Sequence, residues 1–309
     1  MRGSVVRVGL VGAGPWARSV HAPGLAGHPG IALTTVWARR REAAEELARG
    51  HGAEVSTSFE ELLDEVDAVA FAVPPAIQAG LAFEAAKAGK HLILEKPIAP
   101  DVPTAERLAG AVSAAGVTSL VMLTLRFATQ TREWLADLAA TGGWTGGNAR
   151  WLSGALLGGQ YSGSPWRHET GALADVGPHV VDLLDAALGP IADVAGAHRT
   201  SEDLWHLIFR HENGATSSAT LSIALPVEPT VADFSVYGTH GYRALNRDPG
   251  GAAGSYTALL DEFVALIATG TTTHPCDVHR GLHLQRLLDK ALSLGGAFKA
   301  RDRIRVDGP

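Results

Sequence analysis

Residues 5–17 read VVRVGLVGAGPWA, an apolar run typical of a β-strand that passes directly into a glycine-rich turn. The turn has the spacing G-x-G-x-x-A, made by Gly12, Gly14 and Ala17. In this pattern the first glycine permits a tight turn, the second lets the backbone approach a pyrophosphate, and the small third residue lets a helix pack on the strand. A phosphate would lie at the helix N-terminus, where unpaired amides and the helix dipole favour negative charge.

Working outward from this turn, strands and helices alternate. We expect further strands at 31–37, near residue 54, and at 67–73, 91–94 and 119–123, and helices at 41–49, 76–88 and 102–115, with another opened by a capping box at Ser58. This alternation is typical of a parallel, doubly wound sheet. Residues 1–123 are therefore predicted to form a dinucleotide-binding Rossmann domain.

Two strand ends of this domain carry further candidates for cofactor contacts. The strand at 91–94 ends in Glu95-Lys96-Pro97, which places a lysine at the sheet edge where ligands of such folds bind. The strand at 67–73 ends in Val73 and Pro74, where proline forces the chain outward, although an ordinary loop breaker explains the same residues. The predicted cofactor contacts in this group are Gly12, Gly14, Pro15, Trp16, Ala17, Val73, Pro74, Glu95 and Lys96.

The end of the second strand indicates which nicotinamide cofactor is preferred. About 20 residues beyond the glycine motif, an acid normally binds the ribose hydroxyls of NAD, whereas an arginine accommodates the 2′-phosphate of NADP. Here Ala38 stands where the acid is expected, and Arg39 and Arg40 follow it. We therefore predict cofactor contacts from these three residues and a preference for NADP(H), with NAD(H) as the alternative. A solvent-exposed helix start would account for the same arginines.

Beyond residue 123 the pattern changes to extended runs separated by turn signals. The runs are 148–156, 191–198, 203–211, 215–225, 231–237 and 242–245, and Asn213-Gly214 is a hairpin signal between two of them. Helices are expected at 176–188, 255–269 and 278–294. Residues 124–309 are therefore predicted to form an α+β domain with a largely antiparallel, open sheet. A length of 309 residues suits this two-domain α/β organisation.

A second set of candidates lies in the middle of that domain. Asp175 and His179 are four residues apart, which on one helix puts both side chains on the same face. Histidine changes charge near neutral pH, and a nearby carboxylate fixes its tautomer. The alternative is an N-capping aspartate followed by a histidine that only packs. Trp166 and Arg167, in a Gly- and Ser-rich stretch predicted to be a loop, are candidates for substrate contact.

Composition narrows the classes of partner. The net charge of −6, without a basic block, argues against nucleic acid and anionic membrane surfaces, so a small-molecule substrate is expected. The single cysteine, Cys276, cannot form an internal disulfide, and neither a signal-peptide core nor an apolar run of about 20 residues is present, so we expect a cytoplasmic protein. His279 and His283 have metal-ligand spacing but no third ligand beside them, and we predict no metal site.

Together these residues resemble the Gfo/Idh/MocA oxidoreductases. The matching motifs stand in the expected order along the chain: Gly12 to Ala17, Glu95-Lys96-Pro97, Arg126-Phe127, Trp166-Arg167, Gly171 to His179 with its D-x-G-x-H core, and Val236 to Thr239. The resemblance implies a Rossmann domain and a second domain whose open sheet often forms the oligomer interface, so a homodimer or homotetramer is expected. It also implies hydride transfer between NAD(P) and a hydroxyl or carbonyl carbon, usually of a sugar, cyclitol or related polyol.

The resemblance also assigns roles to individual residues. Lys96, Asp175 and His179 match the catalytic lysine, aspartate and histidine, and the Lys96-Pro97 bond is often cis in such proteins. The expected mechanism has His179 accept the hydroxyl proton, Lys96 steady the developing oxyanion, and Asp175 orient His179 or bind a neighbouring hydroxyl. Lys96 and His179 remain alternative carriers of the proton. The predicted substrate contacts are Arg126, Trp166, Arg167, Asp175 and His179.

Several positions depart from the family pattern. Ala38 replaces the acid, Gln78 stands where many members have histidine, and Thr124 and Leu125 replace an asparagine and a tyrosine. Two alternative functions therefore remain. One is an enzyme of the same fold that acts on a non-sugar, such as an aromatic dihydrodiol, a tetrapyrrole or an imine. The other is a non-catalytic nucleotide-binding regulator, which would have no need for the lysine, aspartate and histidine together.

Overall fold

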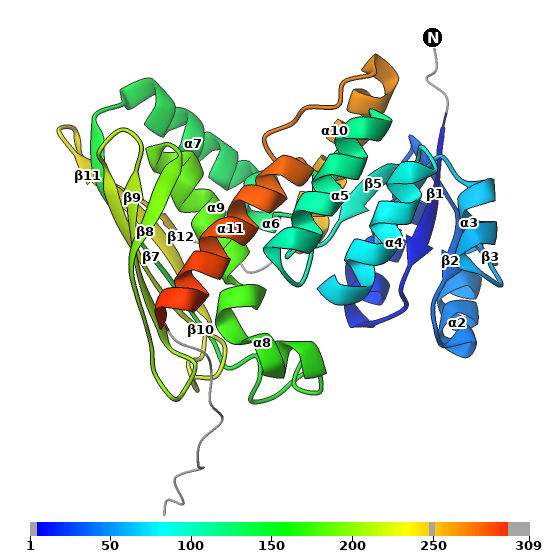
Figure 1. The fold of residues 1–309 in the computed structure, drawn as a ribbon, viewed down its shortest axis with the longest axis horizontal. Helices are drawn as coiled ribbons and strands as arrows, with labels where there is room; N and C mark the ends of the chain where they lie inside the picture. The colour runs from blue at the N-terminus through cyan, green and yellow to red at the C-terminus, as the bar shows by residue number, and fades with distance from the viewer. Residues whose placement is uncertain (1–4, 247–250, 296–309) are drawn as a thin grey trace, which may run out of the picture.

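The computed structural model describes residues 5–246 and 251–295, which form two lobes, each built on its own six-stranded sheet (Figure 1). The chain leaves the first sheet after residue 121 and enters a short helix of the second lobe at residue 124. The predicted domains, 1–123 and 124–309, also contain residues 1–4, 247–250 and 296–309, which lie outside the described residues. The exact limits of the two domains stay a prediction.

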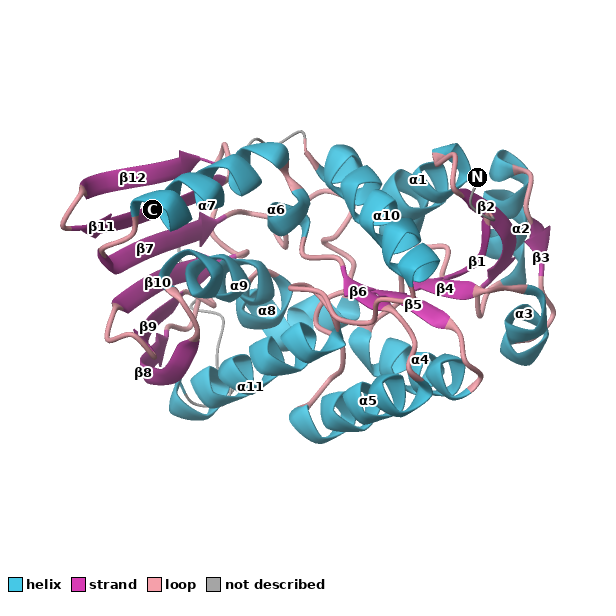
Figure 2. Ribbon diagram, turned by 90° about the horizontal axis from the view of Figure 1, so that it is seen from above, coloured by secondary structure: helices cyan, strands magenta, loops and turns pink. Residues whose placement is uncertain are grey.

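The first lobe has the predicted doubly wound parallel sheet. The strands are ordered β3-β2-β1-β4-β5-β6, and every neighbouring pair runs parallel. Their bounds are β1 Val6–Val11, β2 Ile31–Trp37, β3 Glu54–Val55, β4 Ala68–Phe71, β5 His91–Leu94 and β6 Ser119–Val121. Leu10, Ala70 and Ile93 of the central strands are fully buried because helices cover both faces of the sheet (Figure 2).

The connections of this lobe are a short π-helix and five α-helices. Their bounds are η1 Ala17–His21, α1 Ala22–Gly27, α2 Arg41–His51, α3 Phe59–Glu65, α4 Pro75–Lys87 and α5 Val102–Ala115. Local sequence explains where several of them begin and end. Ser58 caps α3 by accepting from the amide of Glu61 at 3.1 Å, as the predicted capping box requires. Asp101 caps α5 in the same way, and Gly116 ends it in the left-handed conformation.

The second lobe has a mixed sheet that is antiparallel except at one pair. The strands are ordered β12-β11-β7-β10-β9-β8, and only β7 and β10 run parallel. Their bounds are β7 Trp144–Leu152, β8 Ile191–Arg199, β9 Trp205–His211, β10 Thr216–Ser222, β11 Val231–Gly238 and β12 Gly241–Asn246. The hairpin at Asn213-Gly214 is confirmed: it joins β9 to β10, and Gly214 has a φ of +87°.

The helices of the second lobe correct part of the prediction. They are α6 Thr124–Phe127, α7 Thr129–Thr141, α8 Pro165–Asp175, α9 Gly177–Leu188, α10 Ala252–Thr269 and α11 Val278–Gly295. The predicted pattern had no helix at α6 or α7, and it treated the first half of α8, up to Gly171, as a loop. It also began the first sheet strand at 148, four residues after β7 begins, and began β9 at Asp203, which lies in a turn with a φ of +56°.

Helices α10 and α11 connect the two lobes. Helix α10 contacts α1 and α6, and α11 contacts both α5 of the first lobe and β8 of the second. Figures 1 and 2 show α7, α9 and α11 on the side of the second sheet that faces the first lobe, and no described helix on its outer face. Of the small polar residues of β10, Thr216 is exposed, Ser218 and Thr220 are half-buried, and Ser222 is fully buried.

Candidate active site

A pocket of about 440 Å³ lies beyond the carboxyl ends of β1, β2 and β4. It is lined by Gly12, Ala13, Gly14, Trp37, Ala38, Arg39, Arg40, Ala43, Ala72, Val73, Pro74 and Ile77. The structure thus brings together the first two glycines of the turn, the end of the second strand and the Val73-Pro74 segment, all predicted to contact the cofactor. Two arginines and no acid line this pocket.

The backbone of the turn shows why glycine is needed in this pocket. Gly12 has a φ of +115°, and a Cβ at this position would lie 2.4 Å from the carbonyl oxygen of Ala72. A Cβ at Gly14 would meet no atom within 4 Å, so the backbone at Gly14 is open to a close-fitting group. The residues present therefore fit a dinucleotide, whose pyrophosphate needs this close approach of the main chain.

Five other predicted cofactor residues are not in the lining of this pocket: Pro15, Trp16, Ala17, Glu95 and Lys96. Ala17 is fully buried at the start of η1, and Pro15 is exposed in the turn. Trp16 donates from its indole nitrogen to Oε1 of Glu95 at 2.6 Å. This bond connects the glycine-rich turn to the end of β5, where Lys96 follows. The Lys96-Pro97 peptide bond is cis, as predicted.

Lys96 and Asp175 form an ion pair between the two lobes. The ammonium nitrogen of Lys96 lies 2.9 Å from Oδ1 of Asp175, and it also donates to the main-chain oxygen of the same residue. Arg167 approaches the other carboxylate oxygen, with its Nε 3.1 Å from Oδ2. The predicted role of Asp175, to orient His179 or bind a neighbouring hydroxyl, stays a prediction; in the structure its carboxylate pairs with Lys96 and Arg167.

These two cations determine the charge state of the carboxyl group. Burial alone would raise the pKa of Asp175, but the charges of Lys96 and Arg167 and their hydrogen bonds outweigh burial and lower it. Asp175 is therefore ionised at neutral pH. Two aromatic rings flank the guanidinium of Arg167, with centroids 4.5 Å away for Tyr161 and 4.6 Å for Trp166. Stacking of this kind restricts Arg167 to one orientation.

A break in the helix places Asp175 and His179 on different elements. We expected one helix to carry both, but α8 ends at Asp175 and α9 begins at Gly177. Helix α8 is itself kinked at Gly171, where φ is +69° and a Cβ would lie 2.4 Å from Oδ2 of Asp203. That carboxylate accepts from the amide of Ala172 at 2.6 Å and so begins the segment that ends at Asp175.

His179 lies in the first turn of α9 and is buried. Its imidazole stacks on the indole of Trp151 in β7, with ring centroids 5.7 Å apart and planes 18° from parallel. No local pattern predicts this contact, because Trp151 lies 28 positions earlier in an extended run. The stacking fixes the ring plane of His179 against the second sheet.

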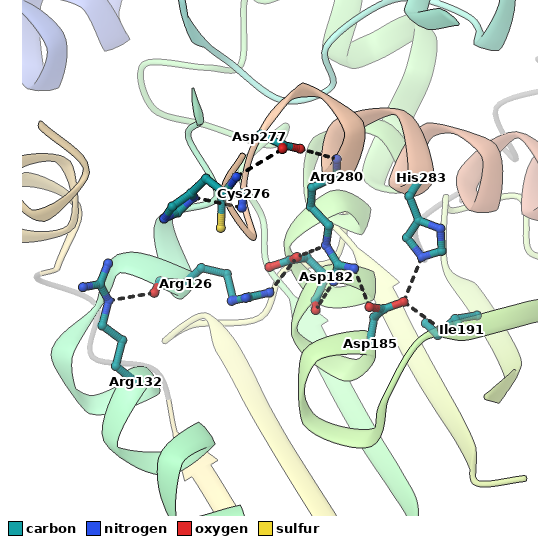
Figure 3. Close-up of polar contacts among 10 residues, drawn as sticks. Arg126, Arg132, Asp182, Asp185, Ile191, Cys276, Asp277, Arg280 and His283 are labelled. Carbon is teal, nitrogen blue, oxygen red and sulfur yellow. Dashed lines mark hydrogen bonds and ion pairs between the residues drawn. The ribbon is translucent and has the colours of Figure 1, made fainter. Parts of the chain in front are cut away.

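Arg126, predicted to contact the substrate, takes part in a different cluster (Figure 3). Its guanidinium lies 3.0 Å from Oδ1 of Asp182 in α9, which also accepts from Nε of Arg280 at 2.6 Å. Arg280 pairs in addition with Asp185, whose second oxygen lies 2.8 Å from Nε2 of His283. This cluster ties α9 to α6 and α11. A substrate contact from Arg126 stays a prediction. In the structure the guanidinium of Arg126 pairs with Asp182.

Comparison with known proteins places this geometry in a family. Residues 6–123 match an oxidoreductase family with an NAD-binding Rossmann fold, and residues 140–243 match the GFO/IDH/MocA C-terminal domain. The chain belongs to the Gfo/Idh/MocA family of oxidoreductases. Its first lobe is accordingly an NAD(P)-binding Rossmann domain.

Individual relatives within the Gfo/Idh/MocA family match parts of the chain. A dTDP-3,4-didehydro-2,6-dideoxy-alpha-D-glucose 3-reductase of Actinomadura kijaniata is 36% identical over 107 residues, which cover 33% of this chain and 32% of that protein. The matched segment thus spans about a third of the relative's length.

Two solved structures share the whole fold. A levoglucosan dehydrogenase in complex with NADH and levoglucosan has a TM-score of 0.82 at 20% identity, over 94% of this chain and 97% of that one. A 3-ketoreductase from Actinomadura kijaniata in complex with NADP has a TM-score of 0.76 at 21% identity, with the same coverage. At these identities the likeness shows a common fold.

Sequence reasoning missed several residues that surround the family's Glu-Lys-Pro segment. Gln78, fully buried in α4, donates to the main-chain oxygen of Glu95 at 2.7 Å and accepts from its amide at 2.8 Å. His21 lies 2.8 Å from the Glu95 carboxylate, and Tyr256 lies 3.0 Å from the other ring nitrogen of His21. His21 follows the glycine motif closely enough to have been singled out, but Tyr256 is 235 positions away from it.

The two histidines with metal-ligand spacing have separate partners. His279 lies 3.0 Å from the hydroxyl of Ser113, and His283 pairs with Asp185. Within residues 5–246 and 251–295, no three histidine, cysteine or acidic side chains are grouped as a metal site would require. Among the same residues, every helix is too short or too polar to cross a bilayer.

Proposed function

We propose that this protein is an NADP(H)-preferring oxidoreductase that transfers a hydride between the nicotinamide and a hydroxyl or carbonyl carbon of a sugar, cyclitol or related polyol. The observation that carries the proposal is the ion pair of Lys96 and Asp175. It joins the end of a Rossmann strand to the second lobe, and His179 lies four residues after Asp175, in the first turn of α9. The printed names of relatives that act on dTDP-sugars and levoglucosan support a sugar-like substrate.

The preference for NADP(H) is supported by the lining of the cofactor pocket. Arg39 and Arg40 lie in it, Ala38 leaves room where an acid would bind the ribose hydroxyls, and no lining residue is acidic. A 2′-phosphate carries two negative charges near neutral pH, and a guanidinium binds it through paired hydrogen bonds. NADH lacks this phosphate and would leave both arginines without their anionic partner.

The catalytic roles follow from the contacts of each side chain. When bound, the cofactor supplies the hydride acceptor or donor. Lys96, held by Asp175, presents an ammonium group that stabilises negative charge on the substrate oxygen. His179, with its ring plane fixed by Trp151, accepts the hydroxyl proton during oxidation and returns it during reduction. Asp175 holds Lys96 and Arg167 in place, and Arg167 contributes the remaining N–H donors for substrate hydroxyls.

The substrate class can be tested with a panel of polyols, aldoses and keto-sugars, followed by nicotinamide absorbance with NADP(H) and NAD(H). We expect turnover with at least one sugar or polyol, faster with NADP(H). An aromatic dihydrodiol and a cyclic imine form a second arm, because Tyr161 and Trp166 place two rings around Arg167. If only the compounds of this second arm are turned over, the substrate class is a flatter molecule and not a sugar. Binding of NADPH without turnover anywhere would favour the regulator.

The role of Lys96 can be tested with the substitution Lys96→Met, which keeps the length of the side chain and removes its charge. We expect turnover to fall by about a thousandfold or more, while the dissociation constant of NADPH changes little. Lys90→Met is the matched control, since Lys90 lies at the start of the same strand and donates to the main-chain oxygen of Val66. Near-normal turnover in Lys96→Met would rule out the mechanism.

We also propose that the outer face of the second sheet pairs with a second copy of the chain, giving a homodimer or homotetramer. Large apolar side chains on this sheet are exposed, among them Ile208, Tyr237 and Tyr242. Ile208→Glu should convert the oligomer to a smaller species in sedimentation velocity. An unchanged sedimentation coefficient in a wild-type oligomer would place the interface elsewhere. A cytoplasmic location stays a prediction from the sequence.

A further inference from the structure

A buried chain of hydrogen bonds lies behind Lys96 and connects three segments that are distant in sequence. The hydroxyl of Tyr256 in α10 lies 3.0 Å from Nδ1 of His21 in η1, and Nε2 of His21 lies 2.8 Å from Oε1 of Glu95. The same carboxylate oxygen accepts from the indole of Trp16 at 2.6 Å. Glu95 is the residue directly before Lys96.

The chemistry of the groups fixes the direction of these bonds. An ionised carboxylate has no proton to donate, so Nε2 of His21 carries hydrogen and donates to Glu95. In a neutral imidazole Nδ1 is then an acceptor, and the hydroxyl of Tyr256 donates to it. Burial, together with the charge of Glu95, raises the pKa of Tyr256 well above its ordinary value, so the hydroxyl keeps its proton. With a neutral His21, each group in the chain therefore has one orientation.

The packing of this chain leaves little freedom. His21 and Tyr256 are both fully buried, and their rings meet with centroids 4.6 Å apart. Tyr256 also lies against Gly24 of α1, where a Cβ would come within 2.4 Å of its ring. The main chain of Glu95 is held independently by Gln78 through two hydrogen bonds. The peptide that carries Lys96 is therefore fixed through both its backbone and the side chain before it.

We propose that His21 and Tyr256 are positioning residues for Lys96, which act by fixing the Glu95 carboxylate and, through the adjoining peptide, the direction in which the ammonium group enters the site. Because Trp16 of the glycine-rich turn binds the same carboxylate, this arrangement also links the cofactor-binding turn to Lys96. The proposal rests on the function proposed above for Lys96.

A second buried histidine provides a matched control. His28 lies 3.1 Å from Asp261 of α10, so it joins the first lobe to α10 by the same type of contact. This contact is separate from the hydrogen bonds around Glu95, because the other ring nitrogen of His28 accepts from the amide of Gly30. The substitution His28→Asn therefore disturbs packing between the lobes without acting on Lys96.

The first test needs no substrate. The full chain is treated with formaldehyde and cyanoborohydride, and methylation of Lys96 is followed by mass spectrometry of its peptide. We expect about fivefold faster methylation in Tyr256→Phe and Glu95→Gln, the factor that loss of one ordinary hydrogen bond gives. His28→Asn should leave the rate at the wild-type value. Equal rates in the wild type and Tyr256→Phe, or equal acceleration in His28→Asn, would overturn the proposal.

Two further readouts separate positioning from simple support of the fold. In ¹⁵N-histidine spectra, the wild-type signal of His21 is assigned as the one missing from His21→Gln. This signal should show the Nε2–H tautomer, and a Nδ1–H tautomer would contradict the proposed bonds. With a substrate from the panel, Tyr256→Phe should lower kcat about tenfold while KM and the NADPH dissociation constant stay near wild type, as expected for a misplaced catalytic group. If no substrate is found, the methylation rates still decide the proposal.

Discussion

Two clusters of acids and bases, one between the two lobes and one around α9, differ in how far their central aspartate is closed to solvent. In the first, Asp175 pairs with Lys96 and Arg167; in the second, Asp182 pairs with Arg126 and Arg280. Each has one aspartate between two cations. The cations are similarly exposed, with Lys96 at 13%, Arg126 at 15% and Arg280 at 14%, but the side chain of Asp175 is 12% exposed and that of Asp182 only 1%.

This difference is the one expected between the ion pair of the proposed active site and a purely structural one. A charge that remains partly open can contact a ligand, whereas a charge sealed between helices can only hold those helices together. The second cluster joins α9, which carries His179, to α6 and α11. The cluster around Asp182 therefore holds the helix that carries His179, a residue of the proposed site.

The largest effect on stability should come from breaking the cluster around Asp182, called the sealed cluster below. Asp182→Ala leaves Arg126 and Arg280 without their shared carboxylate in a buried place, and we expect a loss of about 3–5 kcal/mol in the free energy of unfolding. Urea denaturation measures it. Asp193→Ala is the control, since Asp193 pairs with Arg210 on the exposed sheet surface. A similar, small loss in both variants would show that the buried cluster has no special structural role.

Acid should reveal the same cluster through Asp185. Burial would raise the pKa of this carboxyl, but the hydrogen bond from His283, the charge of Arg280 and the amide of Ile191 lower it from 3.8 to about 2. A lowered pKa adds stability that is complete above the unfolded value and is lost as the pH falls from about 4 to about 2, a contribution of about 2 kcal/mol. In Asp185→Asn, the free energy of unfolding should therefore fall less steeply between about pH 4 and about pH 2 than in the wild type. An unchanged slope would contradict this.

A smaller effect is expected at the cofactor pocket. Arg39→Ala should weaken NADPH binding by about tenfold, which corresponds to about 1.4 kcal/mol, and leave NADH binding unchanged. Arg41→Ala is the matched control, because Arg41 pairs with Glu45 on the surface and is absent from the pocket lining. Titration of nicotinamide fluorescence gives both dissociation constants. Tighter binding of NADH than of NADPH by the wild type would show that the arginines do not bind a phosphate.

The smallest change should be seen at Cys276, which lies beside the sealed cluster. Burial, mainly, raises the pKa of its thiol to about 12, and the residue is almost wholly inaccessible. An aromatic disulfide reagent should therefore not react with the native protein at neutral pH, and should react with one thiol per chain in denaturant. Rapid labelling of the native protein would mean that the region of α11 opens readily.

The first lobe could be predicted from local patterns, and much of the second could not. Strands and helices of the Rossmann lobe alternate with clear caps, such as Ser58 and Asp101. Helix α7 has no side-chain cap at its start, and α8 contains Gly171 in a positive-φ conformation, so neither has the local signals of a regular helix. The parallel pairing of β7 with β10 joins segments about 70 residues apart, which no local pattern reveals.

The candidate site shows the same limit. Lys96 was predicted from its place at the end of a strand, and Asp175 and His179 from their spacing. The partners of these residues come from distant segments: Trp151 stacks on His179, and Tyr256 reaches the Glu95 carboxylate through His21. Such contacts depend on how segments distant in sequence pack together, and they require coordinates.

The comparison of the two aspartates is tested most directly by the turnover of Asp175→Asn and Asp182→Asn, measured with the best substrate of the panel under conditions where both variants are fully folded. We predict that Asp175→Asn loses turnover by about a hundredfold or more, because Lys96 is no longer held, and that Asp182→Asn keeps turnover close to wild type while losing stability. Normal turnover in Asp175→Asn, or an equal loss in both, would contradict the assignment of the Lys96–Asp175 pair as the centre of the chemistry.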